Sequence, residues 1–599
     1  MKKFLFISLL TLAVSYTATA MPFSWGKMIQ PKSFYGESKP RAIKYNNGYI
    51  YVYGAFKDTI DLDMGNGTKY VNSYNTYSAS GYLAKYDLQG NLIWGGSLKG
   101  IKTGNPNCIN PPYNEILDMT FDASNNIYIT GFYDDSVRFE FGGVVKGLKC
   151  PCGISSFIVK VSPNGDVATV NHVTGMQCPT YFSGGAIALD NANSLYTITD
   201  FYGTGDFDFS NGIKVYDHQI YSNFNVVVSR YNKTTMALEW SGMLESNRNL
   251  YGERVLVDNN KNMYVSGKFT GTIDIDFTPG VNNITSVDTA HYDYFIIKYD
   301  SNGNFQWVNQ FTYGGSFDFD VAMDNSSHLL IAGNFKDHIT VLHNNVSQAN
   351  LLSNGAANDL FCIKMDLNGS ITWAKRIGGT YDEYYQGMSV AANDNIVLNA
   401  WFNIGTTLDP LNVTNDYLVT GLCTNGLLTC LSPNGSLVFG GISNALANAN
   451  NGGIGGSIYT CSVWDPSGNL YMAGQNIWQS DINPDTNANA SNMVNNNNNN
   501  FNSFVMKLGT NVANSLIEND NSSSVTCFPS PAKTYCNIQS EQEIISSVEV
   551  YNSMGQCMTK AQPHSKSYKL DLLSYSNGMY FIRYALGAKT GYTSILVTK

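Results

Sequence analysis

Residues 252–310 contain the stretch that decides the fold: GERVLVDNNKNMYVSGKF (252–269), GTIDIDFTPG (271–280) and YFIIKYDSNGNFQWVNQ (294–310). Four short apolar segments are separated here by Asn- and Asp-rich turns and by one longer connection. Turns such as DNNKN and DSNGN supply the positive φ angles that tight hairpins require. The stretch therefore predicts a four-stranded antiparallel meander.

The same order of segments recurs along the chain with a period of roughly 60 residues, as expected of a repeat architecture. The further copies lie at 41–97, 115–169, 185–240, 317–379 and 386–439. One such sheet cannot bury both faces, so it must pack against a neighbour like itself. The period predicts an all-β propeller in which each copy forms one blade.

A seventh copy lacks its last strand. It contains SIYTCSVWDPSGNLYMAGQ (457–475) and SFVMKLGT (503–510), but only polar residues follow. The segment FSWGKMIQ (23–30) is similar to fourth-strand segments such as LIWGGSLK (92–99). We therefore expect Phe23, Trp25 and Met28 to lie in a strand that closes a seven-bladed ring and leaves no open sheet edge. A separate N-terminal arm is the alternative.

The first twenty residues, MKKFLFISLLTLAVSYTATA, have two lysines, a short apolar run and a small-x-small ending. This pattern is typical of a signal peptide cleaved after Ala20. A membrane anchor is the alternative, but the apolar run is shorter than the roughly 20 residues that a spanning helix needs. We expect export, with no transmembrane helix elsewhere.

The formal net charge is -10, and charged residues make up 14% of the chain. A charge of this sign without a basic run argues against nucleic acid and anionic membranes as partners.

Three Asp pairs, Asp61/Asp63, Asp206/Asp208 and Asp274/Asp276, are candidate ligands for calcium. Two carboxylates per copy fall well short of the 6 to 8 oxygens that Ca²⁺ takes, so solvation of an outer strand edge or turn capping is the preferred interpretation. The seven histidines are scattered, and no protease, esterase or phosphate-binding motif is present. We expect no cofactor, and the sequence singles out no catalytic residue.

Basic residues and tryptophans recur at fixed places in the copies, which favours a structural role over a binding surface. They are Lys85, Lys160, Arg230, Lys298, Lys364 and Lys507, and Trp25, Trp94, Trp240, Trp307 and Trp373. Thr169 stands at the tryptophan position of the second copy, and Cys430 at the basic position of the sixth.

The chain has eleven cysteines, which matter in an exported protein because disulfides persist in oxidising compartments. Cys108, Cys150, Cys152 and Cys178 all fall in the second copy or its flanks and are the disulfide candidates. Cys150 and Cys152 are expected to pair outward rather than with each other. A Cys-x-Cys metal site is the weaker alternative.

The motifs D-x-x-N-x-Y-V-x-G and K-Y-D-x-N-G-N-x-x-W resemble the SBBP-type β-propeller repeat of secreted bacterial proteins. The resemblance covers about 490 residues. It implies shape and secretion, because these repeats are not tied to one chemistry.

The C-terminal 74 residues change pattern and resemble the sorting domain of type IX secretion substrates of Bacteroidota, a small β-sandwich. The matching residues are Pro529, Pro531, Ala532, Val550, Tyr551, Asn552, Gly555, Gln556, Gly578, Tyr580 and Arg583. The resemblance implies that 526–599 engages the type IX secretion machinery and is then removed.

The expected organisation is a signal peptide (1–20), a propeller (21–510), a polar linker (511–525) and the sorting domain (526–599). The expected location is secreted or on the outer-membrane surface, reached through the periplasm. The leading functional hypothesis is a binding protein for an extracellular glycan or protein, since loops on a rigid scaffold carry function. A secreted hydrolase or lyase with its site at the propeller channel is the alternative, and a structural surface component is a third possibility.

Overall fold

The computed structural model describes most of the chain beyond residue 20. The described ranges are 21–33, 36–104, 111–176, 181–210, 212–218, 223–278, 280–313, 319–354, 357–379, 381–402, 405–406, 417–418, 424–445, 456–477, 479–484, 492–494, 501–509, 525–528, 532–540, 543–552, 557–586 and 589–599. The chain divides into two compact units, residues 1–510 and 511–599. All regular elements of the described ranges are strands.

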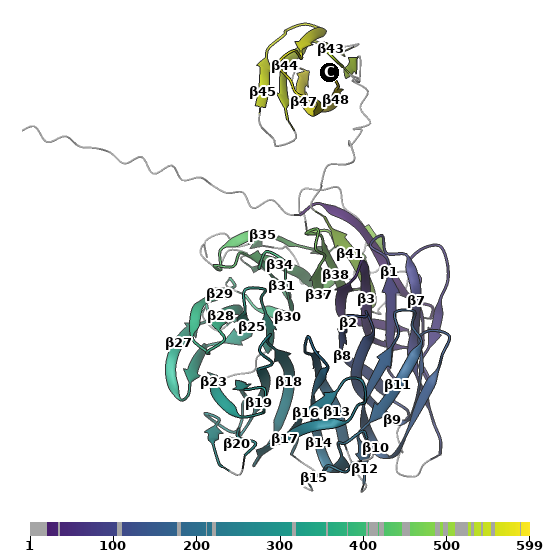
Figure 1. Ribbon diagram of the computed structural model, residues 1–599, viewed down its shortest axis with the longest axis vertical. Coiled ribbons are helices and arrows are strands. Elements are labelled where there is room, and N and C mark those ends of the chain that lie inside the picture. Colours follow the sequence, from purple (N-terminus) through teal and green to yellow (C-terminus); the bar gives the residue numbers. More distant parts are fainter. Residues whose placement is uncertain are drawn as a thin grey trace, which may run out of the picture. The chain divides into compact units, whose positions relative to one another are not determined.

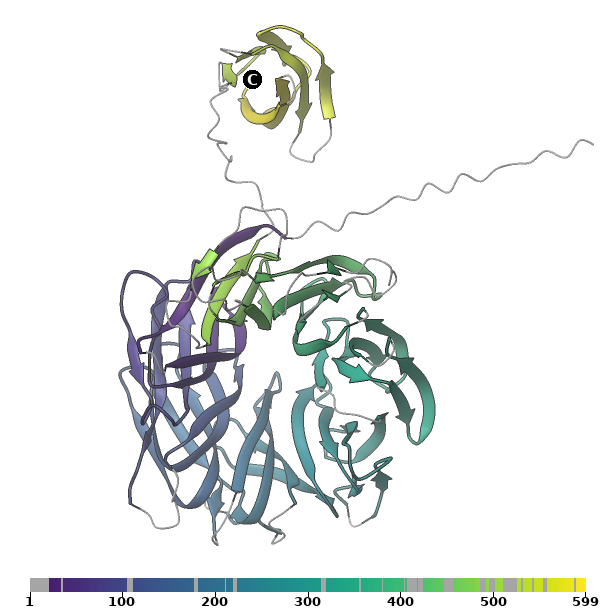
Figure 2. The same cartoon turned by 180° about the vertical axis from the view of Figure 1, so that it is seen from behind.

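The first unit is a β-propeller of four-stranded antiparallel meanders arranged around an axis (Figure 1, Figure 2). Blades 1 to 4 are β2(Glu37–Asn46)-β3(Tyr49–Lys57)-β6(Ser80–Tyr86)-β7(Leu92–Ile101), β8(Asn114–Phe121)-β9(Ile127–Glu140)-β10(Lys146–Val161)-β11(Val167–His172), β13(Tyr181–Leu189)-β14(Ser194–Asp206)-β16(Asn225–Asn232)-β17(Leu238–Ser246) and β18(Leu250–Val257)-β19(Met263–Phe269)-β22(Asp293–Tyr299)-β23(Phe305–Tyr313). Blades 5 to 7 are β24(Phe319–Met323)-β25(His328–Lys336)-β28(Asn358–Asp366)-β29(Ile371–Ile377), β30(Glu383–Val390)-β31(Ile396–Phe402)-β34(Asn425–Leu431)-β35(Leu437–Ile442) and β37(Gly456–Trp464)-β38(Leu470–Ile477)-β41(Asn502–Leu508)-β1(Phe23–Pro31).

The N-terminal strand β1 forms the fourth strand of blade 7, and we call it the closing strand. It runs antiparallel to β41, with Trp25 opposite Lys507 (purple beside light green in Figure 1). The fourth strand of blade 1 has the same register, because Trp94 lies opposite Lys85. The first strand of blade 7 also contacts the first strand of blade 1, so the two ends of the propeller meet.

The core lies between neighbouring blades. Ile29 of the closing strand is fully buried and packs with Ile43 of blade 1 and Val505 of blade 7. Phe23 and Met28 pack on the other face, in the cluster shared by blades 6 and 7. The closing strand therefore completes two hydrophobic clusters at once.

Tight turns join the strands at one end of each blade. In the turn after β6, Asp87 Oδ1 accepts hydrogen bonds from the backbone N–H groups of Gln89 (2.9 Å) and Asn91 (2.8 Å). The turn after β18 repeats this arrangement with Asp258 as the acceptor for Asn260 and Asn262. The recurrent Asp therefore fixes the turn, which explains its spacing in the copies.

The longer connection between the second and third strands of a blade folds outward as a short hairpin or strand extension. In six blades it pairs with strand residues at the end of the preceding blade: β4(Thr59–Asp61) with β1, β9 with β7, β14 with β12(Thr174–Gly175), β20(Thr272–Asp274) with β17, β26(His338–His343) with β23 and β39(Gln479–Asp481) with β36(Asn444–Ala445). The remaining partners are β5(Tyr70–Asn72), β15(Val215–His218), β21(Asn283–Thr285), β27(Val346–Leu352) and β40(Asn492–Val494), and blade 6 has β32(Gly405–Thr406) and β33(Tyr417–Leu418). We call the outward-folding connection between the second and third strands of each blade its clasp.

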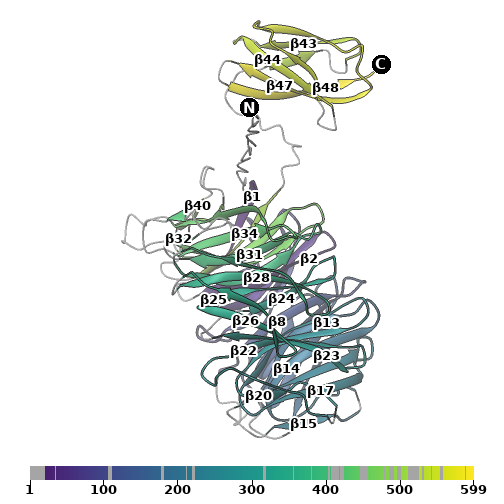
Figure 3. The same cartoon turned by 90° about the vertical axis from the view of Figure 1, so that its left-hand side faces the viewer.

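The second unit is a small β-sandwich, as expected (Figure 3). One sheet has the order β42(Val525–Phe528)-β43(Tyr535–Ser540)-β46(Ser567–Asp571), and the other β45(Cys557–Ala561)-β44(Ile545–Tyr551)-β47(Gly578–Leu586)-β48(Lys589–Val597). Both sheets contribute to one hydrophobic core. Pro529, Pro531, Gly555 and Gln556 lie outside the described residues.

Among the described residues, none belongs to a helix of the length and apolar character that crossing a membrane requires.

Candidate functional site

The two faces of the propeller are built differently. One face carries the tight Asp-containing turns, and we call it the turn face. The opposite face carries the interblade connections and the clasps, and we call it the connection face. Since loops of variable length and composition gather on the connection face, a ligand site is expected there.

The innermost strands bring polar groups to the propeller axis. Six of the seven inner strands contain a register shift, at Pro40/Ala42, Ile116/Asp118, Gly184/Ile187, Gly252/Arg254, Tyr385/Gly387 and Tyr459/Cys461. A bulge re-aims side chains and is common beside binding sites. Arg41 and Arg254 lie at two of these bulges, and their side chains are 49% and 41% exposed. The axis is therefore open to solvent and polar.

Two of the ion pairs on these inner strands hold Asp118 and Asp320. Lys44 Nζ is 3.1 Å from Asp118 Oδ1, and Arg254 Nε donates a hydrogen bond to Asp320 Oδ1 at 2.8 Å. Tyr385 donates to the other oxygen of Asp320 at 3.3 Å. Burial alone would raise the pKa of Asp118, but Lys44, Arg254 and two backbone N–H groups lower it overall. Asp118 and Asp320 are partners of cations on neighbouring blades, which is a structural role.

Asp200 differs from these paired carboxylates. It lies on β14, opposite Ser183, and its Oδ1 accepts a hydrogen bond of 2.8 Å from Gly252 N–H of the next blade. Burial raises the pKa of Asp200 to about 7, and the nearby Glu253 adds to this rise. A carboxyl group that titrates near neutral pH can act as a hydrogen-bond donor or as an acid.

Glu253 and Lys268 lie beside Asp200. Lys268 Nζ is 2.9 Å from Glu253 Oε1. Burial raises the pKa of Glu253 even though Lys268 opposes the shift. The site therefore combines one carboxyl group near neutrality, a second raised carboxyl group and one ammonium group.

Partly buried aromatic rings extend from this polar group along the connection face of blades 3 and 4. Tyr181 stacks on Tyr202 with ring centroids 5.8 Å apart, and its ring is 5.2 Å from that of Phe224. Phe224 is 5.2 Å from Tyr251, which is 6.0 Å from Tyr292. Asp200 acts electrostatically on both Tyr181 and Tyr251 and raises their pKa values, although burial contributes more. We call these five rings the aromatic row.

This site is not among the residues predicted from the sequence, but the repeats contain a signal for it. Most positions of the second strand repeat from blade to blade, including an aromatic or aliphatic residue near its start and, in five blades, Phe near its end, where blades 2 and 7 have Tyr133 and Asn476. The position just before this one varies completely. It holds Ala55, Phe132, Asp200, Lys268, Asn334, Trp401 and Gln475. Variation inside a repeated framework marks positions that the fold leaves free. Asp200 and Lys268, two of the polar residues of the site, stand at this position.

A second hollow lies on the outer rim, with a volume of about 330 Å³. It is lined by two clasps and β7, and its charged residues are Lys69, Lys99, Arg138 and Glu140. Arg138 Nε is 3.2 Å from Glu140 Oε1. Lys69, Lys99 and Arg138 are exposed, so the charged groups of this hollow are less fixed than those beside the aromatic row.

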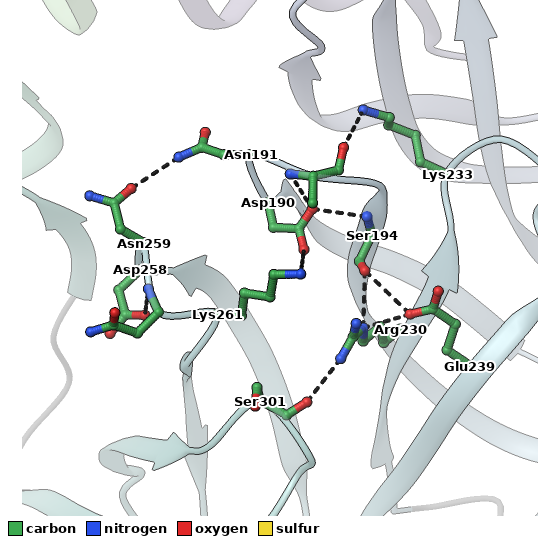
Figure 4. A network of polar contacts seen from close by, with 12 residues as sticks. Asp190, Asn191, Ser194, Arg230, Lys233, Glu239, Asp258, Asn259, Lys261 and Ser301 are labelled. Atoms are coloured by element: carbon green, nitrogen blue, oxygen red, sulfur yellow. Dashed lines mark hydrogen bonds and ion pairs between the residues drawn. The ribbon is translucent and has the colours of Figure 1, made fainter.

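The turn face is occupied by contacts between blades (Figure 4). Lys261 Nζ is 3.7 Å from Asp190 Oδ2, and Asn191 donates to Asn259 at 3.0 Å, both from blade 3 to blade 4. Arg230 also reaches the next blade and donates to the carbonyl oxygen of Ser301 at 2.9 Å. Polar groups of this face are thus used within the fold.

Three of the recurring tryptophans and the basic residues opposite them have the same structural use. Trp94 Nε1 and Lys85 Nζ both donate to the carbonyl oxygen of Pro163 in the next blade, each at 3.0 Å. Trp307 and Lys298 donate in the same way to Leu367, and Trp373 and Lys364 to Pro433. We call this arrangement the carbonyl latch. It supports the expectation that these residues stabilise the fold.

The Asp pairs also serve the fold. Asp61 Oδ1 accepts hydrogen bonds from the N–H groups of Asp63 (3.0 Å) and Lys69 (2.7 Å), and Asp206 and Asp274 do the same in their clasps. They cap the clasp loops. Within the described residues, no three His, Cys, Asp or Glu side chains are grouped to hold a metal ion.

The proposed disulfides lie largely outside what is described. Cys108 and Cys178 fall in undescribed segments, and the side chain of Cys152 is not described. Cys150 is buried, with its Sγ 3.2 Å from Ser155 Oγ. Their pairing stays a prediction.

The sandwich was compared with known families. Residues 526–598 match the model of the secretion system C-terminal sorting domain. This match confirms the predicted sorting domain, and its presence indicates export of the chain, to the surface or the medium.

The propeller is similar to one curated protein, the uncharacterized WD repeat-containing protein L264 of Acanthamoeba polyphaga mimivirus. The two are 23% identical over 389 residues, which cover 55% of this chain and 26% of the relative. The chain thus spans about a quarter of that protein's length.

Solved structures show weaker likeness. PorZ, described as a bacterial surface component of the type-IX secretion system of Porphyromonas gingivalis, is 9% identical, with coverage of 96% of this chain and 100% of that chain and a TM-score of 0.21. The Synechocystis apocarotenoid oxygenase is 8% identical, with coverage of 82% and 94% and a TM-score of 0.33. Scores this low carry no functional argument for this chain.

Proposed function

We propose that this chain is a glycan-binding β-propeller that the type IX secretion machinery exports through recognition of residues 526–599. The propeller is the cargo, and it is secreted or held at the outer-membrane surface after passing through the periplasm. The repeats are of the SBBP type in this proposal.

The observation that carries glycan binding is the aromatic row beside Asp200, Glu253 and Lys268. Aromatic faces stack on the apolar faces of sugars, while carboxyl and ammonium groups hydrogen-bond the sugar hydroxyls. The rings are preformed by contact with one another, so little conformational entropy is lost on binding. A protein ligand is the other possible occupant, and the experiment below separates the two.

Binding of the purified full chain to a glycan array, followed by calorimetry with the best ligand, tests this proposal. The double variant Tyr181→Ala/Tyr251→Ala should weaken binding at least tenfold, about 1.4 kcal/mol. Tyr77→Ala is the matched control, because Tyr77 is 86% exposed and is not part of the row. Unchanged glycan affinity in the double variant would contradict the proposal. So would a chain that binds no glycan but captures a protein at this face.

Asp200 favours one second candidate, a secreted hydrolase or lyase acting on a glycan. A glycosidase needs one carboxyl group that stays protonated near neutral pH and a second carboxylate nearby. Asp200 and Glu253 are the residues for these roles. Release of reducing ends by the parent chain, abolished in Asp200→Asn with binding retained, would support catalysis, whereas binding without turnover supports the binding function.

A further inference from the structure

The sorting domain contains a pair of cysteines outside the four candidates discussed above. Cys527 lies on β42, opposite Ile538 of β43, and Cys536 is two residues from Ile538 on the same strand. Side chains of alternate residues share one face of a sheet, so the two cysteines point to the same side. Both pack into the sandwich core, where Cys536 is fully buried and Cys527 partly buried.

The two cysteines are diagonal neighbours across the β42–β43 pair. Both side chains belong to the same hydrophobic cluster. The strand β42 has only four residues and lies at the edge of its sheet, so a small shift can bring the sulfurs to bonding distance.

We propose that Cys527 and Cys536 form a disulfide when the chain passes through an oxidising compartment. This inference rests on the proposed export route for the place of oxidation, but not on glycan binding. The bond would fasten the first strand of the sorting domain to the second.

The two cysteines are suited to different steps of thiol–disulfide exchange. Cys536 is buried, whereas Cys527 is partly exposed and can be reached by a donor in solution. Cys527 is therefore the attacking thiolate, and Cys536 is the resolving thiol.

The oxidant is a disulfide-bonded donor, either glutathione disulfide or a thiol-oxidising protein. The Cys527 thiolate attacks one donor sulfur, forms a mixed disulfide and releases one donor thiolate. Cys536 then loses its proton and attacks Cys527 Sγ, which releases the second donor thiolate. The two protons lost by the cysteines end on the two donor thiols, so the donor is reduced as the pair is oxidised.

Peptide mapping of the full chain tests the proposal. Trypsin cleaves after Lys533, between the two cysteines, so the disulfide joins two otherwise separate peptides. Cys557 lies in the same peptide as Cys536, and Cys557→Ser is the background that removes this ambiguity. The chain is purified from the periplasm with N-ethylmaleimide present, and a cytosolic preparation is oxidised with glutathione disulfide.

The linked peptide pair is expected in both preparations, with loss of the link after reduction. Alkylated Cys527 and Cys536 in both preparations would overturn the proposal. If glutathione disulfide forms the link but the periplasmic chain lacks it, Cys527 and Cys536 can form a disulfide, but the chain does not pass through an oxidising periplasm.

Discussion

At the residue scale, the carbonyl oxygen of Pro163 receives two hydrogen bonds from the preceding blade, from Trp94 and Lys85. Gly165, two residues later, has a φ of +89°, and a Cβ there would lie 3.0 Å from the Trp94 ring. The turn glycine therefore serves two purposes: it adopts the left-handed backbone and leaves room for the tryptophan.

Gly165→Ala should destabilise the propeller by about 1 kcal/mol or more from backbone strain and by about 1–3 kcal/mol from overpacking against Trp94. Gly468→Ala is the matched control, since Gly468 has a φ of +80° and nothing lies within 4 Å of its added Cβ. Chemical denaturation of both variants measures the difference. Equal losses would show that the tryptophan contact contributes nothing.

Asp200 gives a pH-dependent prediction. Its pKa in the folded protein is about 7, above the unfolded value of about 4, so the protonated carboxyl stabilises the fold at low pH. This stabilisation is lost as the pH rises through about 7. When the pH is raised from 4 to 8, the free energy of unfolding of Asp200→Asn should therefore rise by about 1–2 kcal/mol relative to that of the parent. This figure is discounted for the partial exposure of Asp200.

Urea denaturation of both proteins at these two pH values checks the sign. A variant whose stability follows that of the parent at both values would place the pKa of Asp200 in its ordinary range.

At the element scale, the closing strand could be predicted because Trp25 completes a set of fourth-strand tryptophans. The carbonyl latch could not, because its donors and its acceptor are about 60 to 80 residues apart, in different blades. The clasps were hidden for a similar reason: a short hairpin sequence does not specify which neighbouring strand it joins. The sequence analysis took these connections as loops for binding, whereas six of them pair with the preceding blade.

The closing strand can be tested at a single position. Ile29 is fully buried between blades 7 and 1, so Ile29→Ala should lower the free energy of unfolding by about 2–4 kcal/mol. Ser24→Ala is the control, because Ser24 is exposed on the same strand and its loss should change little.

Deletion of residues 23–30 removes the strand itself and should open blade 7, with a lower Tm and association through the exposed edge of β41. A deleted chain that melts with the parent and stays monomeric would refute closure by this strand.

At the scale of the whole molecule, the repeats predicted the propeller and the C-terminal motifs predicted the sandwich, because both patterns are local in sequence. The aromatic row could not be predicted, since its rings come from first and second strands and from 2-to-3 connections of two blades, and they meet only when the blades pack. Asp200 acquires its shifted pKa from the same packing. The proposed function thus depends on contacts between repeats more than on any one repeat.

The claim that one chain carries a propeller and its own export signal is tested most directly by fractionation of the native host with mass spectrometry of both chain ends. The surface or released form should lack residues 1–20 and most of 526–599, with the new C-terminus within the polar segment 511–525. A chain truncated after Thr510 should remain as a folded propeller in the periplasm. A truncated chain that reaches the surface, or a surface form that still ends at Lys599 in cells with a working secretion system, would contradict the claim.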